Sequence, residues 1–171
     1  MEPRSILSIS AMTTLGLALL PSSIVAQQGT LKQQLVGTWT LVSCEAKQPF
    51  CVNPNGTLML DAGGRYAVVT AARGRPKVTV APNRADQTPE DYKAIAQGVV
   101  ANFGTWSVSE ADKTLSRRVE GALFPTGEGT EGKVSVSLAG DELKLTATNP
   151  AGVRTDTVYL ELGRRPHTQM I

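Results

Sequence analysis

Two adjacent arginines, Arg117 and Arg118, lie in a segment that otherwise alternates apolar and polar residues. Successive side chains of a β-strand point to opposite faces, so Arg117 shares a face with Leu115 and Val119, and Arg118 points the other way. A guanidinium on an apolar face needs a partner, because an unpaired buried charge is costly. That partner is a protein carboxylate, water reached by the long side chain, or the anionic head of a ligand. A register slip of one residue would give this position to Arg118.

Residue types that carry catalysis or bind metals are scarce. The one histidine, His167, lies in a polar tail, so neither a Ser-His-Asp set nor a Cys-His pair can be assembled. A metal would need further Cys or His ligands. Gly63-Gly64 is not followed by a helical pattern, unlike a phosphate-binding loop. We therefore predict no catalytic residues, no metal and no cofactor, although an enzyme that works by positioning its substrate would leave little trace.

The first 26 residues have the pattern of a secretory signal peptide. Arg4 supplies a positive charge, residues 6–20 are mostly apolar, and Pro21-Ser22-Ser23 interrupts the run before Ala26. The apolar run is too short for a membrane anchor, so stable membrane insertion is not expected. The sequence predicts export to the periplasm or the exterior, with residues 27–171 forming a single domain.

The two cysteines, Cys44 and Cys51, flank a loop of six residues. In an exported chain, so close a pair predicts a disulfide across the loop. Free thiols would be expected only in a reducing compartment, which the predicted signal peptide argues against.

Composition excludes one class of partner and favours one class of fold. The 171 residues carry a formal net charge of +2 and only 5% aromatic residues, with no basic stripe that would bind nucleic acid. Thr, Val, Gly and Ser are abundant, which favours β-structure. The oligomeric state stays open.

Two segments with the same motif, Gly37-Thr38-Trp39 and Gly104-Thr105-Trp106, organise the chain. Each continues as a half-buried strand, and glycine permits a sharp turn or a close approach before the large indole. Both tryptophans are expected in one core, with contact to a ligand as the alternative. By alternation, Glu45 shares a strand face with Trp39. Because Glu45 lies at a strand end beside a loop, we expect its side chain to be exposed to solvent.

The remaining pattern predicts a mainly β chain. Further alternating segments occur at regular spacing, at 57–61, 66–70, 114–120, 133–138, 142–148 and 153–162, with turns at 53–56, 62–64, 140–141 and 149–152. About eight short strands favour a sandwich or a barrel, and we predict a closed antiparallel barrel with one short flanking helix. Its interior would be filled or would hold one small ligand.

Two helical segments are expected, a short helical turn and one helix, and the helix is the flanking one. Residues 30–36 are consistent with a short turn before the first strand. Thr88-Pro89 starts a helix whose apolar residues, from Tyr92 to Phe103, fall on one buried face. Between 71 and 87, a basic excursion that includes Arg73 and Arg84 is either a solvated loop or a guard that steers acidic ligands, with a short strand at 78–80.

The motif order resembles the bacterial lipocalin-like domain family. The opening Gly37-Thr38-Trp39-Thr40-Leu41 matches its Gly-x-Trp-x-Leu strand, and further similarity lies at 55–58, 103–108, 119–125, 129–131 and 138–145. The resemblance implies a small antiparallel barrel with an interior suited to an apolar molecule, and no agreed chemistry. Where many members have a histidine, this chain has Leu115-Ser116-Arg117-Arg118.

The leading hypothesis is an exported, non-enzymatic barrel that binds a small apolar or amphiphilic molecule. The residues expected to contact it are Trp39, Leu41, Tyr66, Trp106, Leu115, Arg117 and Val119. Two alternatives remain. One is a small barrel enzyme, such as an isomerase or cyclase, that acts on an apolar substrate. The other is a protein-binding barrel that resembles an exported protease inhibitor.

Overall fold

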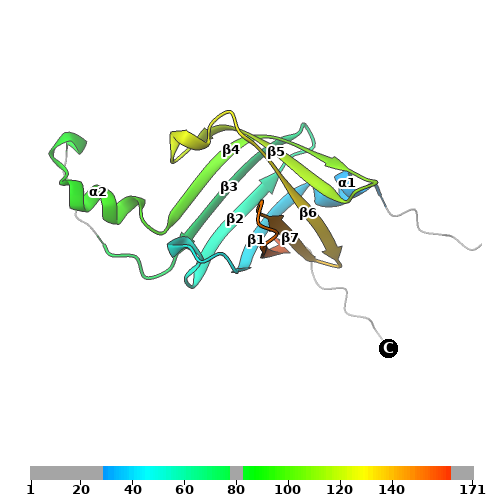
Figure 1. Cartoon of the computed structure of the whole chain (residues 1–171), viewed down its shortest axis with the longest axis horizontal. Coiled ribbons are helices and arrows are strands. Elements are labelled where there is room, and N and C mark those ends of the chain that lie inside the picture. Colours follow the sequence, from blue (N-terminus) through cyan, green and yellow to red (C-terminus); the bar gives the residue numbers. More distant parts are fainter. Residues whose placement is uncertain (1–28, 78–82, 163–171) are drawn as a thin grey trace, which may run out of the picture.

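The computed structural model describes residues 29–77 and 83–162. Within these residues eight antiparallel strands close into a barrel, with each strand beside the next and the last returning to the first (Figure 1). This confirms the predicted architecture. The strands are β1 (Gly37–Cys44), β2 (Pro54–Leu60), β3 (Arg65–Ala72), β4 (Val99–Ser109), β5 (Thr114–Ala122), β6 (Glu131–Ala139), β7 (Glu142–Thr148) and β8 (Arg154–Glu161).

The core occupies the barrel interior. Trp39 on β1 and Trp106 on β4 are 0% and 4% exposed, so the predicted burial of both indoles is confirmed. Residues from the inward faces of all eight strands join them because alternation places every second side chain inside. The other strand members of this core are Leu41, Leu58, Leu60, Tyr66, Val68, Leu115, Val134, Val136, Leu143, Leu145 and Tyr159.

A short helix, α1 (Leu31–Leu35), packs against one end of the barrel core. Its Leu31 and Leu35 are buried, and the indole Nε1 of Trp39 donates to the carbonyl oxygen of Leu35 at 2.9 Å. The carboxylate of Glu110 accepts hydrogen bonds from the backbone N–H groups of Leu31 and Lys32 at 2.9 and 3.0 Å. We call this the closed end. α1 lies within residues 30–36, where the sequence is consistent with a short helical turn, whereas the predicted flanking helix is the one that starts at Thr88.

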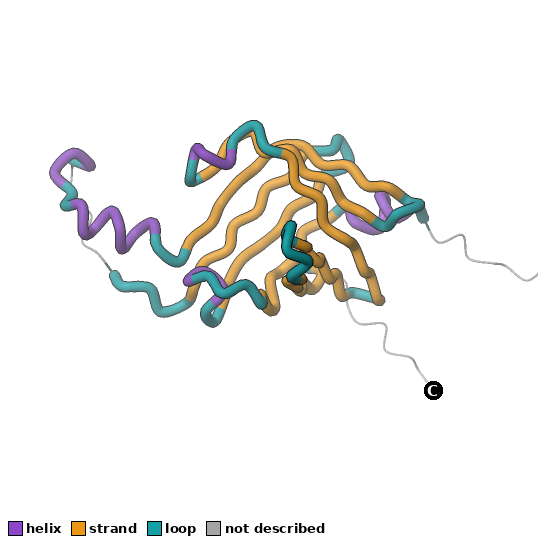
Figure 2. Tube along the Cα trace, in the orientation of Figure 1, coloured by secondary structure: helices purple, strands orange, loops and turns teal. Residues whose placement is uncertain are grey.

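The opposite end, here called the open end, carries the longer connections (Figure 2). The Cys44–Cys51 disulfide is present there, which confirms the predicted bond, with the two Cα atoms 5.2 Å apart. It constrains the loop that contains a 3₁₀ turn, η1 (Pro49–Cys51), which packs against β3 and β4. Two further 3₁₀ turns are η2 (Arg84–Asp86) and η3 (Pro125–Gly127).

The second predicted helix is shorter than expected, and its packing prediction is wrong. α2 (Pro89–Ala96) starts at the predicted Thr88 cap, but none of its residues is buried. It stands clear of the barrel wall in Figure 1. The helix ends where Gln97 adopts an extended conformation. Gly98 then has φ +73°, which glycine adopts readily, and β4 begins at Val99. The apolar residues from Val99 onward therefore belong to a strand.

The turn predicted at 53–56 is also displaced. β2 already begins at Pro54 and pairs with β3 along its whole length. Gly56 is needed for close approach between strands, because a Cβ there would lie 2.2 Å from the carbonyl oxygen of Val69. The predicted signal peptide, the predicted strand at 78–80 and His167 lie outside the described residues.

Candidate ligand-binding site

The strand register places Arg117 on the inward face of β5. Arg117 is opposite Trp106 on β4 and Gly132 on β6, and Leu115 on the same face is fully buried. Arg118 is exposed and points outward. Of the two registers that the sequence allows, the structure has the one in which Arg117 faces the interior.

Inside the barrel, Arg117 lies against an aromatic ring. Its guanidinium carbon is 5.7 Å from the ring centre of Tyr66, within the range of a cation–π interaction. The Tyr66 hydroxyl donates to Oδ1 of Asn102 at 2.8 Å, which fixes the ring. Among the described residues, Arg117 forms no ion pair. Its charge is therefore balanced by an aromatic face and not by a carboxylate.

Two tyrosines are affected by this arginine. Burial raises the pKa of Tyr66 and of Tyr159, and the positive charge of Arg117 opposes the rise in both cases. Tyr66 lies on β3 and Tyr159 on β8, so the charge of Arg117 acts on side chains from two separate parts of the wall. Sequence reasoning missed Tyr159, because alternation alone does not show which inward residues converge.

Open space adjoins Arg117 on the β6 side. A Cβ built on Gly132 would have no atom within 4 Å, and Gly132 shares the inward face with its partner Arg117. Gly132 is itself exposed, so this space is open to solvent at that end of β6. Neither Gly132 nor Asn102 was a sequence candidate, since a glycine and an amide carry no signal by themselves. The wall at this level therefore leaves room beside a cation.

The seven residues predicted to contact a ligand all lie on inward faces, but they divide into two groups. Five of them are at most 6% exposed and belong to the packed core: Trp39, Leu41, Tyr66, Trp106 and Leu115. Both indole N–H groups already have acceptors, the carbonyl oxygens of Leu35 and Asp61. Arg117 and Val119 are only partly buried and lie nearer the open end.

Comparison with known proteins agrees with this architecture. The family model of the lipocalin-like domain matches residues 36–158. The chain belongs to the lipocalin-like domain family. No curated protein matches it significantly.

Among solved structures, this lipocalin-like chain is similar to fatty-acid-binding protein 1 of Echinococcus granulosus, with 14% identity and a TM-score of 0.39, covering 76% of this chain and 98% of that one. It is also similar to the REP1-NXSQ fatty acid transporter, with 13% identity and a TM-score of 0.38, covering 78% and 99%. With likenesses this distant, the ligands of those proteins are not carried over to this chain.

The other charged candidate, Glu45, lies outside the lipocalin-like barrel. The β1–β8 register shifts between Leu41 and Ser43, so a β-bulge there reverses the side-chain alternation. Glu45 is exposed, and its Oε2 accepts a hydrogen bond from the N–H of Asp156 at 3.4 Å.

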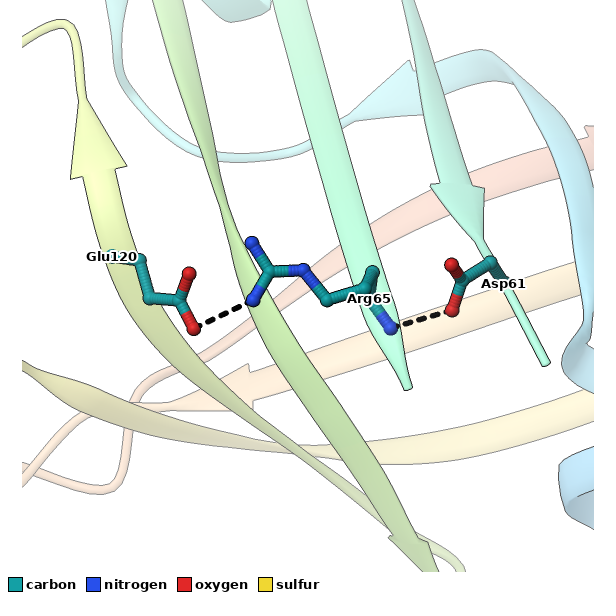
Figure 3. A network of polar contacts seen from close by, with 3 residues as sticks. All are labelled: Asp61, Arg65 and Glu120. Carbon is teal, nitrogen blue, oxygen red and sulfur yellow. Dashed lines mark hydrogen bonds and ion pairs between the residues drawn. The ribbon is translucent and has the colours of Figure 1, made fainter. Parts of the chain in front are cut away.

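A polar network on the outer face of the lipocalin-like barrel joins β3 and β5 to the turn that follows β2 (Figure 3). Nη1 of Arg65 lies 2.7 Å from Oε1 of Glu120, and the backbone N–H of Arg65 donates to Asp61 at 2.6 Å. The hydrogen bond from Arg65 lowers the pKa of Glu120. Both side chains of the ion pair are substantially exposed, so the network is a surface interaction that adds little to stability.

An apolar groove of about 520 Å³ lies on the outer face of β3, β4 and β5. Val69, Phe103 and Leu123 form its walls and are 42%, 51% and 44% exposed. The Phe103 ring covers Gly121, where a Cβ would be 2.5 Å away. A contiguous exposed apolar patch often marks an interaction site, so this groove is a second candidate site.

The described part of the chain also bears on metal binding and on membrane crossing. There, no group of three or more His, Cys, Asp or Glu residues is placed to hold a metal ion. Within the same residues, no helix is long and apolar enough to cross a membrane.

Proposed function

We propose that the protein binds a small hydrophobic or amphiphilic molecule in the open half of its barrel. The observation that carries this proposal is the open space beside Gly132, on the same inward face as the partly buried Arg117. Ligand sites typically combine an apolar lining with a few placed polar groups, and this region has both. Because core side chains fill the closed half, the ligand is small or enters only part of the barrel.

We also propose that the protein works outside the cytoplasm as a single mature domain of residues 27–171, after removal of residues 1–26. The Cys44–Cys51 disulfide supports this, because disulfides persist in oxidising compartments. An exported barrel that binds an apolar molecule would carry it through water or keep it from aggregating.

The experiment is a titration of the mature protein with Nile red, a neutral dye that fluoresces in apolar surroundings. Gly132→Leu adds a side chain to the open space on the inward face of β6. Ser135→Leu adds the same side chain to the outward face of that strand. We expect Gly132→Leu to weaken dye binding at least tenfold with an unchanged unfolding midpoint, and Ser135→Leu to have no effect. Equal affinities for both variants would contradict interior binding.

The outer groove favours a second candidate function, in which the barrel binds a protein. Exposed Val69, Phe103 and Leu123 would accept an apolar side chain of the partner. Phe103→Ser tests this by opening the groove without touching the interior. If the dye, or an exported protease offered as partner, loses affinity for Phe103→Ser and not for Gly132→Leu, the outer face is the functional one.

A further inference from the structure

We infer that the ligand is an anionic amphiphile whose carboxylate head is held by the Arg117 guanidinium and the Tyr159 hydroxyl. This inference rests on the proposed interior binding and names the chemistry of the ligand. It assigns distinct roles to two tyrosines that both lie on the inward face. Tyr159 would donate to the head, and Tyr66 would position the arginine.

Arg117 has the properties of an anion-binding group. It is partly withdrawn from water and has no ion pair among the described residues. Its neighbour on β6 is Gly132, which leaves the space beside it open. A guanidinium presents a planar fork of N–H donors that matches a carboxylate, and such charge-assisted hydrogen bonds are stronger than neutral ones. An anionic head in that space would balance the charge.

Tyr159 supplies a second donor. The residue is 4% exposed, yet its hydroxyl makes no hydrogen bond to any described residue. The hydroxyl oxygen is not among the fully buried polar atoms without a partner in the described residues, so it borders accessible space and can donate to a ligand there. The ring projects inward from β8, between Leu41 and Leu143. The effect of Arg117 on the pKa of Tyr159 is consistent with the two groups facing a common space.

Tyr66 differs, because its hydroxyl already donates to Asn102 at 2.8 Å. What it offers to Arg117 is the face of its ring, 5.7 Å from the guanidinium carbon. Tyr66 is therefore a positioning residue. It limits the directions in which the long arginine side chain can point, and thereby keeps the fork inside the barrel.

The head is expected to carry a single negative charge. One guanidinium and one phenol match a carboxylate, whereas a phosphate dianion would call for a second cation. The adjacent Arg118 points outward and is exposed, so it does not supply that charge. The apolar tail would then lie along Val119 toward the open end.

The test compares decanoate with decanol, two probes that share a tail and differ in the head. Calorimetric titration of the mature wild type should give tighter binding of decanoate. Arg117→Met should weaken decanoate about 10- to 100-fold, the scale of a hydrogen bond to a charged group, and leave decanol within about twofold. Tyr159→Phe keeps the ring and should weaken decanoate about tenfold. Arg118→Met, the matched change on the outer face, should alter neither affinity.

The role of Tyr66 needs a readout that simple destabilisation would not move, namely the ratio of decanoate to decanol affinity. Tyr66→Leu removes the ring and should lower this ratio. Tyr66→Phe restores the ring without the hydroxyl and should recover most of it. A ratio that falls equally in both variants would contradict the positioning role.

The outcomes separate the two proposals. If wild type binds neither probe, interior binding of such molecules is wrong. If it binds both, and Arg117→Met weakens both equally or neither, interior binding stands and the carboxylate clamp is wrong. Should Arg117→Met fail to fold, Arg117→Lys keeps the charge but loses the fork. If both Arg117→Lys and Tyr159→Phe fold and still prefer decanoate over decanol as strongly as wild type does, the proposed carboxylate site is also wrong.

Discussion

Gly104 lies so close to Arg118 that a Cβ atom on it would be 2.0 Å from the Arg118 carbonyl oxygen. The contact occurs where the β4–β5 register shifts, beside the second Gly-Thr-Trp motif. Glycine at this position therefore lets two backbones approach, as the motif predicts, and brings Trp106 into the core.

Gly104→Ala should destabilise the protein by about 1–3 kcal/mol, because backbone must move to admit the methyl group. Urea unfolding followed by tryptophan fluorescence measures the loss. Gly132→Ala is the matched control, since its Cβ would meet no atom within 4 Å. If the two variants unfold at the same urea concentration, the close approach has no energetic consequence.

Trp39→Ala should lower the free energy of unfolding by about 3–5 kcal/mol, as expected for truncation of a buried aromatic residue. Trp39 is fully buried and also donates to Leu35 in α1, so the variant loses both the core packing and a contact to the helix. Phe103→Ala, at a ring that is 51% exposed, should cost far less. A urea midpoint for Trp39→Ala close to that of wild type would contradict this placement.

Removal of the disulfide by the double change Cys44→Ala and Cys51→Ala should lower the unfolding free energy by about 2–3 kcal/mol. The crosslink restricts the unfolded chain, and the reduction in stability is measured by urea denaturation. Intact-mass analysis provides the control, because unreduced wild type should take up no alkylating groups. Uptake of two groups without reduction would contradict the bond.

The stability of the closed end should depend on pH through Glu110. Hydrogen bonds from the backbone N–H groups of Lys32 and Leu31 lower its pKa below 4.5 in the folded protein. A lowered folded-state pKa gives stability that is present above about pH 4.5 and is lost as the pH falls through the folded-state value.

Glu110→Gln should therefore lose less stability than wild type between pH 6 and pH 3. Urea midpoints measured across this range provide the test. Glu120 and Asp156 also have lowered pKa values and contribute acid sensitivity of the same sign in both proteins. Identical pH profiles for the variant and wild type would rule out a contribution from Glu110.

The strands could be predicted because most have one buried and one solvated face, which imposes a two-residue period on the sequence. The prediction failed where two periods overlap. Tyr92 and Ile95 continue at helical spacing into Val99, and the backbone conformations of Gln97 and Gly98 separate α2 from β4. Glu45 shows the other difficulty, since one extra residue in a bulge reverses the alternation beyond it.

The candidate site was only partly predictable for a related reason. Alternation was sufficient to place Arg117 on an apolar face, but the choice between Arg117 and Arg118 depended on register. The convergence of Tyr66 and Tyr159 on that guanidinium depends on how the barrel closes. Gly132 contributes to the site because its missing side chain leaves open space, and no sequence pattern predicts such a space.

The seam between β1 and β8 has a consequence for how the chain acquires its structure. Trp39 pairs with Glu161, so the first strand completes its pairing only with the last. Contacts between the two ends of a chain are closed late and at a large entropic cost, which makes barrels of this kind slow folders on the scale of about milliseconds to seconds. A chain that is still being synthesised cannot close this barrel. The barrel consequently stays unclosed until β8, its final strand, is available.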